Sequence, residues 1–433
     1  MACANTRARR NERGGKTVNE EKHEEDIQFT QTELERPKVN IKDLILSLVA
    51  VLLCGCTLSG AIPAAYIGLA SAAMFVYVII AIRNIGAVLQ LLLTSVLVTA
   101  LTFLPVCGAA VLALMLGAGT LAWLFMTLPK YKWAPIGLLA VSYGLGCLVT
   151  SDFVIPLLAL VFLPAAALMA WAHARDLGRT STVLHAFLGF IFAALAALCV
   201  LLFKNYGSVN YNVLMTFVNQ LKDLFVTIAA EGGKILLVAV EEAAAEAALP
   251  ADAVETLRQT FAQAFAESNL RIMADTLMGL APALIGVPAL IISYLSNVVL
   301  LRKYYNTEWR SHMTLAACTL TVSPAASVIY FVCMLIVVVV SKQSVFLMAV
   351  TNMCLLLLPG LALVGINVIL HNARRTGGWL GKASILLVVA VVFCMGLSSL
   401  YFLALWGAYV TISAALHKKI MQKLKDQNKK DQN

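Results

Sequence analysis

The chain has 433 residues, of which 61% are hydrophobic and only 13% charged, against about half and about a quarter in ordinary soluble domains. A water-soluble core cannot hold this excess of apolar residues. Uncharged apolar stretches of about 17 to 25 residues recur along the chain, and a helix of that length crosses a hydrocarbon core of about 30 Å. The composition therefore argues against a soluble enzyme or a nucleic-acid partner, and it predicts a protein that crosses the membrane several times.

The first 43 residues predict a disordered cytoplasmic arm. Residues 1–40 hold eight Lys/Arg and eight Asp/Glu, and this composition buries too little apolar surface to offset the entropy lost on ordering. Residues 20–26 are acidic, and the first apolar run begins only at Leu44, whereas a cleaved signal peptide opens with a basic region and a short apolar run.

The predicted fold class is all-α, a polytopic transmembrane helix bundle of about 12 spans, with a range of about 8–12. The strands of a membrane barrel would alternate polar and apolar residues, whereas these stretches are apolar on every face. We place the spans near residues 44–60, 64–82, 87–104, 106–128, 134–150, 153–173, 183–203, 278–301, 314–340, 345–370, 384–398 and 400–416.

Basic residues divide the short connections between spans into two kinds. By the positive-inside rule, the basic connections and both termini are cytoplasmic. The basic tail fits this scheme when residues 383–416 fold as a hairpin near Gly396, and a single span there would leave eleven spans. The basic connections hold Arg83; Lys130 and Lys132; Arg175 and Arg179; Arg302, Lys303 and Arg310; and Arg374, Arg375 and Lys382.

The connection 204–277 is long and acidic, with five Lys/Arg and nine Asp/Glu, and the topology places it outside. An amphipathic helix should begin near Pro250, and an earlier helix over 209–229 should end at Glu231-Gly-Gly. We expect these helices to cap the outer mouth of the bundle or to lie in the membrane interface; the alternative is a lid that gates a substrate. The apolar residues at helical spacing are Val254, Leu257, Phe261 and Phe265.

Catalytic groups are scarce. The histidines lie in the leader or at span ends, and no span interior holds Asp, Glu, Lys or Arg, the groups that proton relays and ion-coupled pumps use. Residues 377–382 resemble a phosphate loop, but the glycine spacing is one residue short and Ala383 stands where Ser or Thr is required. The ten cysteines form no paired metal motif. We expect no enzyme activity, no cofactor and no metal.

Uncharged polar side chains in the C-terminal half form a candidate polar cavity. Asn in hydrocarbon is unfavourable unless it is hydrogen-bonded, so these side chains should face the bundle. Four prolines, at 282, 288, 324 and 359, should kink the helices around them. The alternative is that the polar groups only hold helices together. The candidate residues are Ser293, Tyr294, Asn297, Asn352 and Asn367.

Two further patterns concern packing and the membrane boundary. Ala64, Gly68 and Ala72 form a small-residue stripe that lets helices approach closely, either inside the bundle or against a partner protein. Ala109, Ala113 and Gly117 repeat this spacing. Aromatic and basic residues after the eighth span predict interface anchors on the cytoplasmic side, and these are Arg302, Lys303, Tyr304, Tyr305, Trp309 and Arg310.

Three stretches carry a family resemblance: HARDLGRTSTV, LAPALIGVPALIISYLSNVVLLRKY and LALWGAYVTISAALHKK. With the N-terminal helical hairpins and the long outer connection, their order resembles the YybS-like family of bacterial membrane proteins, a domain of unknown function. The likeness covers most of residues 44–425. The family looks distantly similar to the substrate-binding membrane subunits of energy-coupling-factor transporters, whose small-residue contact helix would correspond to residues 61–73.

These observations predict a non-enzymatic protein of the bacterial cytoplasmic membrane. We expect the lipid bilayer as its surroundings, a small-molecule ligand, and a partner membrane subunit or ATPase subunit, as in the ligand-binding component of a small-solute transporter. The alternative is a scaffold or regulator of envelope or signalling proteins. The expected parts are the arm 1–43, membrane helices 44–203, the outer connection 204–277, membrane helices 278–416 and the basic tail 417–433.

Overall fold

The computed structural model describes residues 40–82, 85–247, 250–305, 321–340, 344–376 and 398–431, with residues 379, 383 and 386. Helices make up 89% of these positions, and none of them lies in a strand. The predicted all-α class is therefore confirmed for the described part of the chain. The expected arm lies outside it, apart from residues 40–43, which already belong to the first helix and its cap.

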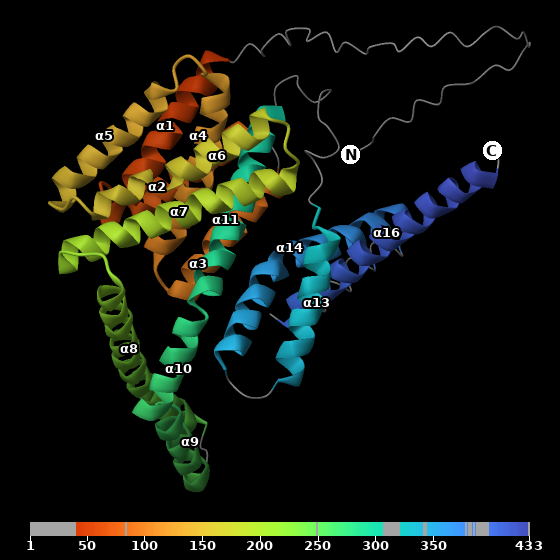
Figure 1. Cartoon of the computed structure of the whole chain (residues 1–433). Helices are drawn as coiled ribbons and strands as arrows, with labels where there is room; N and C mark the ends of the chain where they lie inside the picture. Colours follow the sequence, from red (N-terminus) through yellow and green to blue (C-terminus); the bar gives the residue numbers. More distant parts are fainter. Residues whose placement is uncertain are drawn as a thin grey trace, which may run out of the picture. The chain divides into compact units, whose positions relative to one another are not determined.

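The apolar helices (Figure 1) overlap most of the predicted spans, although α13 begins only at Pro324 and α16 continues past the predicted end at residue 416. The number of 12 spans stays a prediction. Nine helices in the described ranges are long and apolar enough to cross a membrane, and two shorter apolar helices cover 86–102 and 324–339. The predicted span at 384–398 lies almost wholly outside the described residues. The helices are α1 (Ile41–Leu58), η1 (Ala64–Tyr66), α2 (Ile67–Ile82), α3 (Ile85–Thr102), α4 (Pro105–Thr127), α5 (Trp133–Thr150), η2 (Ile155–Leu160), α6 (Phe162–Ala174), α7 (Arg179–Tyr206), α8 (Tyr211–Glu246), α9 (Ala251–Ala264), α10 (Glu267–Gly279), α11 (Ala281–Tyr305), α13 (Pro324–Val339), α14 (Val345–Thr376) and α16 (Ser398–Asp431).

Helix α4 is the centre around which α1, α2, α3, α6 and α11 pack. It is buried on every face over most of its length, because small residues let neighbouring helices come close in a solvent that supplies no hydrophobic drive between them. A Cβ at Gly119 would collide with the backbone carbonyl of Ser296 on α11, and a Cβ at Gly117 would press on the Phe162 ring. The small-residue repeat at Ala109, Ala113 and Gly117 is thus packed inside the bundle.

Helices α13, α14 and α16 share a second apolar cluster. The backbones of α14 and α16 meet at a pair of glycines: a Cβ at Gly365 would strike the carbonyl oxygen of Leu403, and a Cβ at Gly407 would strike that of Leu361. Glycine is required at both positions because each faces main chain, which cannot move aside as a side chain can.

The prolines act differently from one another. Pro288 and Pro359 lie inside α11 and α14, and the kinks expected there stay a prediction. The prediction that Pro282 kinks α11 is wrong, because it is the second residue of that helix, where proline is tolerated. The prediction that Pro324 kinks a span is wrong, because it is the first residue of α13. Proline loses no helical hydrogen bond there, and Ser323 caps the helix by accepting a bond from the backbone N–H of Ala326 at 3.2 Å.

The long connection folds into three helices, with α8 running beside α10 and α9 packed on both (Figure 1). The prediction that a helix ends at Glu231-Gly-Gly is wrong, because α8 continues to Glu246. Gly233 serves packing instead: a Cβ there would collide with the Phe265 ring. The amphipathic helix expected after Pro250 is α9, which ends at Ala264, and a separate helix, α10, leads into α11.

The glycine pair gives a test of how tightly α14 and α16 pack. We expect Gly365→Ala to destabilise the protein by about 1–3 kcal/mol, the usual cost of overpacking a close contact. Gly360→Ala, five residues earlier on the same helix, is the matched control, since its Cβ would meet only Val322 at 3.7 Å. Thermal unfolding in detergent measures both, and equal melting temperatures for the two variants would contradict the close crossing.

Candidate functional site

The predicted polar residues do not gather in one place. Asn352 on α14 clamps the junction between α10 and α11: its side-chain oxygen accepts from the backbone N–H of Ala283 at 3.0 Å, and its nitrogen donates to the carbonyl of Gly279 at 2.8 Å. Asn367 lies about 22 Å further along α14, at about 1.5 Å per residue, and is exposed. Asn352 therefore has the role of holding helices together.

The other three candidates lie on α11. Ser293 is fully buried and donates to the carbonyl of Ala289 at 2.6 Å, within its own helix. Asn297 is also fully buried, and its side-chain oxygen accepts from Nε of Arg179 at 3.3 Å. The guanidinium carbon of Arg179 lies 4.9 Å from the centre of the Tyr294 ring. Arg179, the first residue of α7, thus joins two of the predicted residues.

Two polar atoms beside this contact have no hydrogen-bond partner among the described residues. They are the amide nitrogen of Asn297 and the hydroxyl of Ser296, both on fully buried residues. A buried donor without an acceptor costs about 1–3 kcal/mol. Because Arg179 holds the oxygen end of the Asn297 amide, the nitrogen end is left to donate to something else. We define Arg179, Tyr294, Ser296 and Asn297 as the α7–α11 polar site.

Lys303 occupies an aromatic cage in the same last turns of α11. The expectation that it is an interface anchor on the cytoplasmic side does not fit its burial, because only 5% of its surface is exposed. Its ammonium lies 3.8 Å from the centre of the Trp123 ring and 5.4 Å from that of Tyr77, and it donates to the hydroxyl of Ser47. The cage therefore draws on α1, α2 and α4 around one residue of α11.

The energetics make this lysine unusual. Removing an ammonium from water costs several kcal/mol, and a desolvated cation–π contact returns about 2 kcal/mol. Asp43, in the first turn of α1, adds an electrostatic attraction, and the Tyr77 hydroxyl lies 3.1 Å from that of Thr120, which fixes the ring. An ionisable group buried in a membrane bundle is by default a candidate for function.

The structure describes only some of the remaining predicted interface anchors. Arg302 is half-buried, and Tyr304 and Tyr305 complete α11. Nothing is described of the side chains of these two tyrosines, and Trp309 and Arg310 lie outside the described residues. Their assignment as anchors therefore stays a prediction.

The small-residue stripe on the second span is exposed. Ala64, Gly68 and Ala72 all face away from the described helices, and a Cβ at Gly68 would meet no atom within 4 Å. The expectation that the stripe packs inside the bundle therefore does not match its exposure in the described part of the chain. Exposure alone does not distinguish a lipid-facing surface from a partner-facing one.

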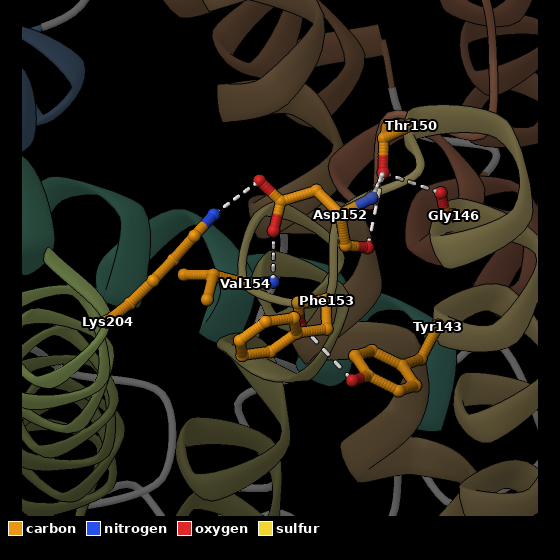
Figure 2. A network of polar contacts seen from close by, with 7 residues as sticks. All are labelled: Tyr143, Gly146, Thr150, Asp152, Phe153, Val154 and Lys204. Atoms are coloured by element: carbon orange, nitrogen blue, oxygen red, sulfur yellow. Dashed lines mark hydrogen bonds and ion pairs between the residues drawn. The ribbon is translucent and has the colours of Figure 1, made fainter.

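An ion pair ties the start of η2 to the end of α7. Figure 2 shows the Lys204 ammonium at the Asp152 carboxylate, 2.6 Å away. The same carboxylate accepts from the backbone N–H of Val154 at 2.8 Å, and the Tyr143 hydroxyl donates to the carbonyl of Phe153 at 3.2 Å. The Lys204 hydrogen bond first, and the Val154 N–H second, hold the pKa of Asp152 below its ordinary value.

No family model, no curated protein and no solved structure matches this chain. The class of protein that the fold defines is therefore the coarse one: an apolar helical protein whose helices suit several membrane crossings. The resemblance to the YybS-like family stays a prediction.

Sequence reasoning missed Arg179 as a site residue and missed the cage. Arg179 was placed only among the basic connection residues, and Trp123 lies within an apolar run with no polar neighbour to mark it. One signal was present: Lys303 follows a span whose last apolar residue is only two positions earlier, close enough for the side chain to fold back along the helix.

A double-mutant cycle tests the cage. We expect Trp123→Leu to destabilise the protein by about 2 kcal/mol or more, because it leaves a buried cation without its main contact. Lys303→Met keeps the apolar stem and removes the charge, so it should change stability by less than about 1 kcal/mol, as buried charges replaced by apolar groups often do. In the Lys303→Met background, Trp123→Leu should lower the free energy of unfolding by less than it does in the wild-type protein. Strict additivity of the two changes in thermal unfolding would show that the rings and the ammonium do not interact.

The Asp152 pair predicts a pH dependence of stability. A carboxyl whose pKa is lowered by folding contributes stability above its unfolded pKa of about 3.9, and this stability is lost as the pH falls through the lower, folded pKa. We expect the stability of the Asp152→Asn variant to fall less than that of the wild-type protein as the pH is lowered. The difference should be largest at low salt, because the pair is solvent-accessible and salt screens it. Glu242→Gln on exposed α8 is the control, and unfolding curves recorded below pH 5 compare the three proteins.

Proposed function

We propose that the chain is a non-enzymatic integral protein of the bacterial cytoplasmic membrane, with both termini in the cytoplasm, and that it is the ligand-binding component of a small-solute transporter. The proposal combines apolar helices that suit a membrane with a polar site inside their bundle. On this proposal, energy comes from a partner membrane or ATPase subunit, and α8–α10 lie outside the cell.

One observation carries the ligand-binding part: the Asn297 amide is buried, with its oxygen held by Arg179 and its nitrogen without a partner among the described residues. Buried polar groups in hydrocarbon normally form hydrogen bonds with the protein. Asn352 is an example in this chain, because both ends of its amide bind backbone atoms of neighbouring helices. A solute that presents a carbonyl or carboxylate oxygen would accept from the free N–H. Ser296 and the Tyr294 ring supply a hydroxyl and an apolar wall beside it.

A second candidate function has its own observation. The exposed stripe of Ala64, Gly68 and Ala72 leaves the backbone of α2 open to close approach, which favours a scaffold or regulator that binds another membrane helix. Cross-linking from single cysteines along this stripe in intact cells would distinguish this role, since a lipid-facing surface gives no specific adduct.

The ligand-binding proposal is tested on protein purified in mild detergent, with co-purified small molecules identified by mass spectrometry. We expect Asn297→Leu to remain folded but to bind the solute about 5- to 150-fold more weakly, because an unpaired ligand group costs about 1–3 kcal/mol. Asn367→Leu is the matched control, since the same exchange on an exposed residue should keep the solute at full occupancy.

Two outcomes contradict the proposal. The wild-type protein could carry no small molecule in stoichiometric amount, or the Asn297→Leu and Arg179→Gln variants could both retain it fully. In either case the α7–α11 polar site would be a contact between helices, like that of Asn352.

A further inference from the structure

Helix α16 does not stop where the last span was expected to end. It runs without a break from Ser398 to Asp431, so the predicted basic tail continues the helix of the membrane span. At about 1.5 Å per residue the helix is about 51 Å long, well beyond a hydrocarbon core of about 30 Å. The part after Leu416 therefore enters the headgroup layer and the water beyond it.

One exposed apolar face runs along α16 from Phe402 to Leu424. Phe402, Tyr409 and Leu416 are seven residues apart, and Ile420 and Leu424 continue the same side at four-residue steps. Each of them is about half exposed, from 48% at Leu424 to 58% at Phe402. The opposite side, with Ala404 and Ala408, is buried against α13 and α14. In the span this exposed face meets lipid, and it continues beyond Leu416 without turning to another side.

Lysines are concentrated in the part of α16 beyond the span, and Lys419 and Lys423 lie beside the apolar face, each three residues after one of its members. Lys418, Lys419 and Lys423 are exposed, and the sequence adds Lys425, Lys429 and Lys430, with only Asp426 and Asp431 as acids. An amphipathic helix with a basic face next to a membrane span binds anionic headgroups, each lysine near the surface adding about fivefold in affinity, the equivalent of about 1 kcal/mol.

We propose that residues 417–431 of α16 bind the anionic phospholipid surface of the leaflet into which the helix emerges. Leu416, Ile420 and Leu424 lie at the edge of the acyl chains, while Lys419 and Lys423, beside them on the helix, contact phosphate groups. A tilt within the usual range of up to about 40° keeps the apolar face on lipid as far as Leu424 without a break in the helix. Lipid is the occupant because this face continues that of a helix apolar enough to cross a membrane, and exposed lysines lie beside it.

The test uses the full chain in vesicles with the same lipid in both leaflets, so its result does not depend on the proposed orientation or transport function. In a version without native cysteines, Leu424→Cys carries an environment-sensitive fluorophore. The vesicles contain either phosphatidylcholine alone or equal parts of phosphatidylcholine and phosphatidylglycerol. We expect blue-shifted emission and quenching by brominated lipid in the anionic vesicles, and a clear loss of both at high salt.

Two controls are matched to this measurement. Gln422→Cys places the same fluorophore on the other side of the helix and should respond little to lipid charge. Exchange of Lys419 and Lys423 for Gln should weaken the response of the Leu424 probe by well over tenfold, from about fivefold per lysine. Exchange of Lys234 and Arg258 for Gln on α8 and α9 removes the same charge and should leave the response of the Leu424 probe unchanged.

The proposal is overturned if the Leu424 probe gives the same signal in neutral and anionic vesicles. A signal that depends on the ratio of protein to lipid, and not on lipid charge, would assign the face to a second copy of the chain. Equal responses at Gln422 and Leu424 would show a helix that enters the surface without a preferred side.

Discussion

The close approach of α4 and α11 is the contact on which the described bundle depends. Gly119 lets the α11 backbone pack against α4 at Ser296, and α4 in turn is the helix around which the N-terminal helices assemble. Because that contact fixes the height and rotation of α11, it places Asn297 against Arg179 on one side and Lys303 within the Trp123 cage on another. A side chain at Gly119 would therefore disturb packing, polar site and cage together.

Three buried polar side chains of the bundle differ in the partners that replace water around them. These differences indicate where a functional site lies. Asn352 has its hydrogen bonds met by backbone at a helix junction. The ammonium of Lys303 contacts two aromatic rings and donates a hydrogen bond to one hydroxyl, and these contacts replace its water shell. Asn297 is satisfied only at its oxygen within the described residues. In a low-dielectric interior an unmet donor is costly, so the third case calls for an explanation that the first two do not.

Sequence could predict the apolar helices because a length and an all-round apolarity suited to lipid mark each of them, and the bounds of α1 to α7 and α11 agree with the predicted stretches within a few residues. It could not predict that α8 passes through Gly232 and Gly233, since the reason is the Phe265 ring, which arrives from a later helix. The burial of Lys303 has the same cause, because Trp123, Tyr77 and Ser47 are distant in sequence. Asn297 was chosen correctly as a buried residue, but its partner Arg179 depends on how α7 packs against α11.

The length of α8 has a mechanical consequence. The helix follows a left-handed turn at Gly207, next to the segment that the Asp152–Lys204 pair ties down, and it extends for 36 residues. At about 1.5 Å per residue it is a rod of about 54 Å, so a rotation of about 10° at its base would carry its far end through roughly 9 Å. Ion pairs from Lys222 and Arg271 couple this rod to α10, and α10 leads directly into α11. Helices α8 and α10 thus form a lever whose short arm is α11, the helix that carries Asn297 and Lys303.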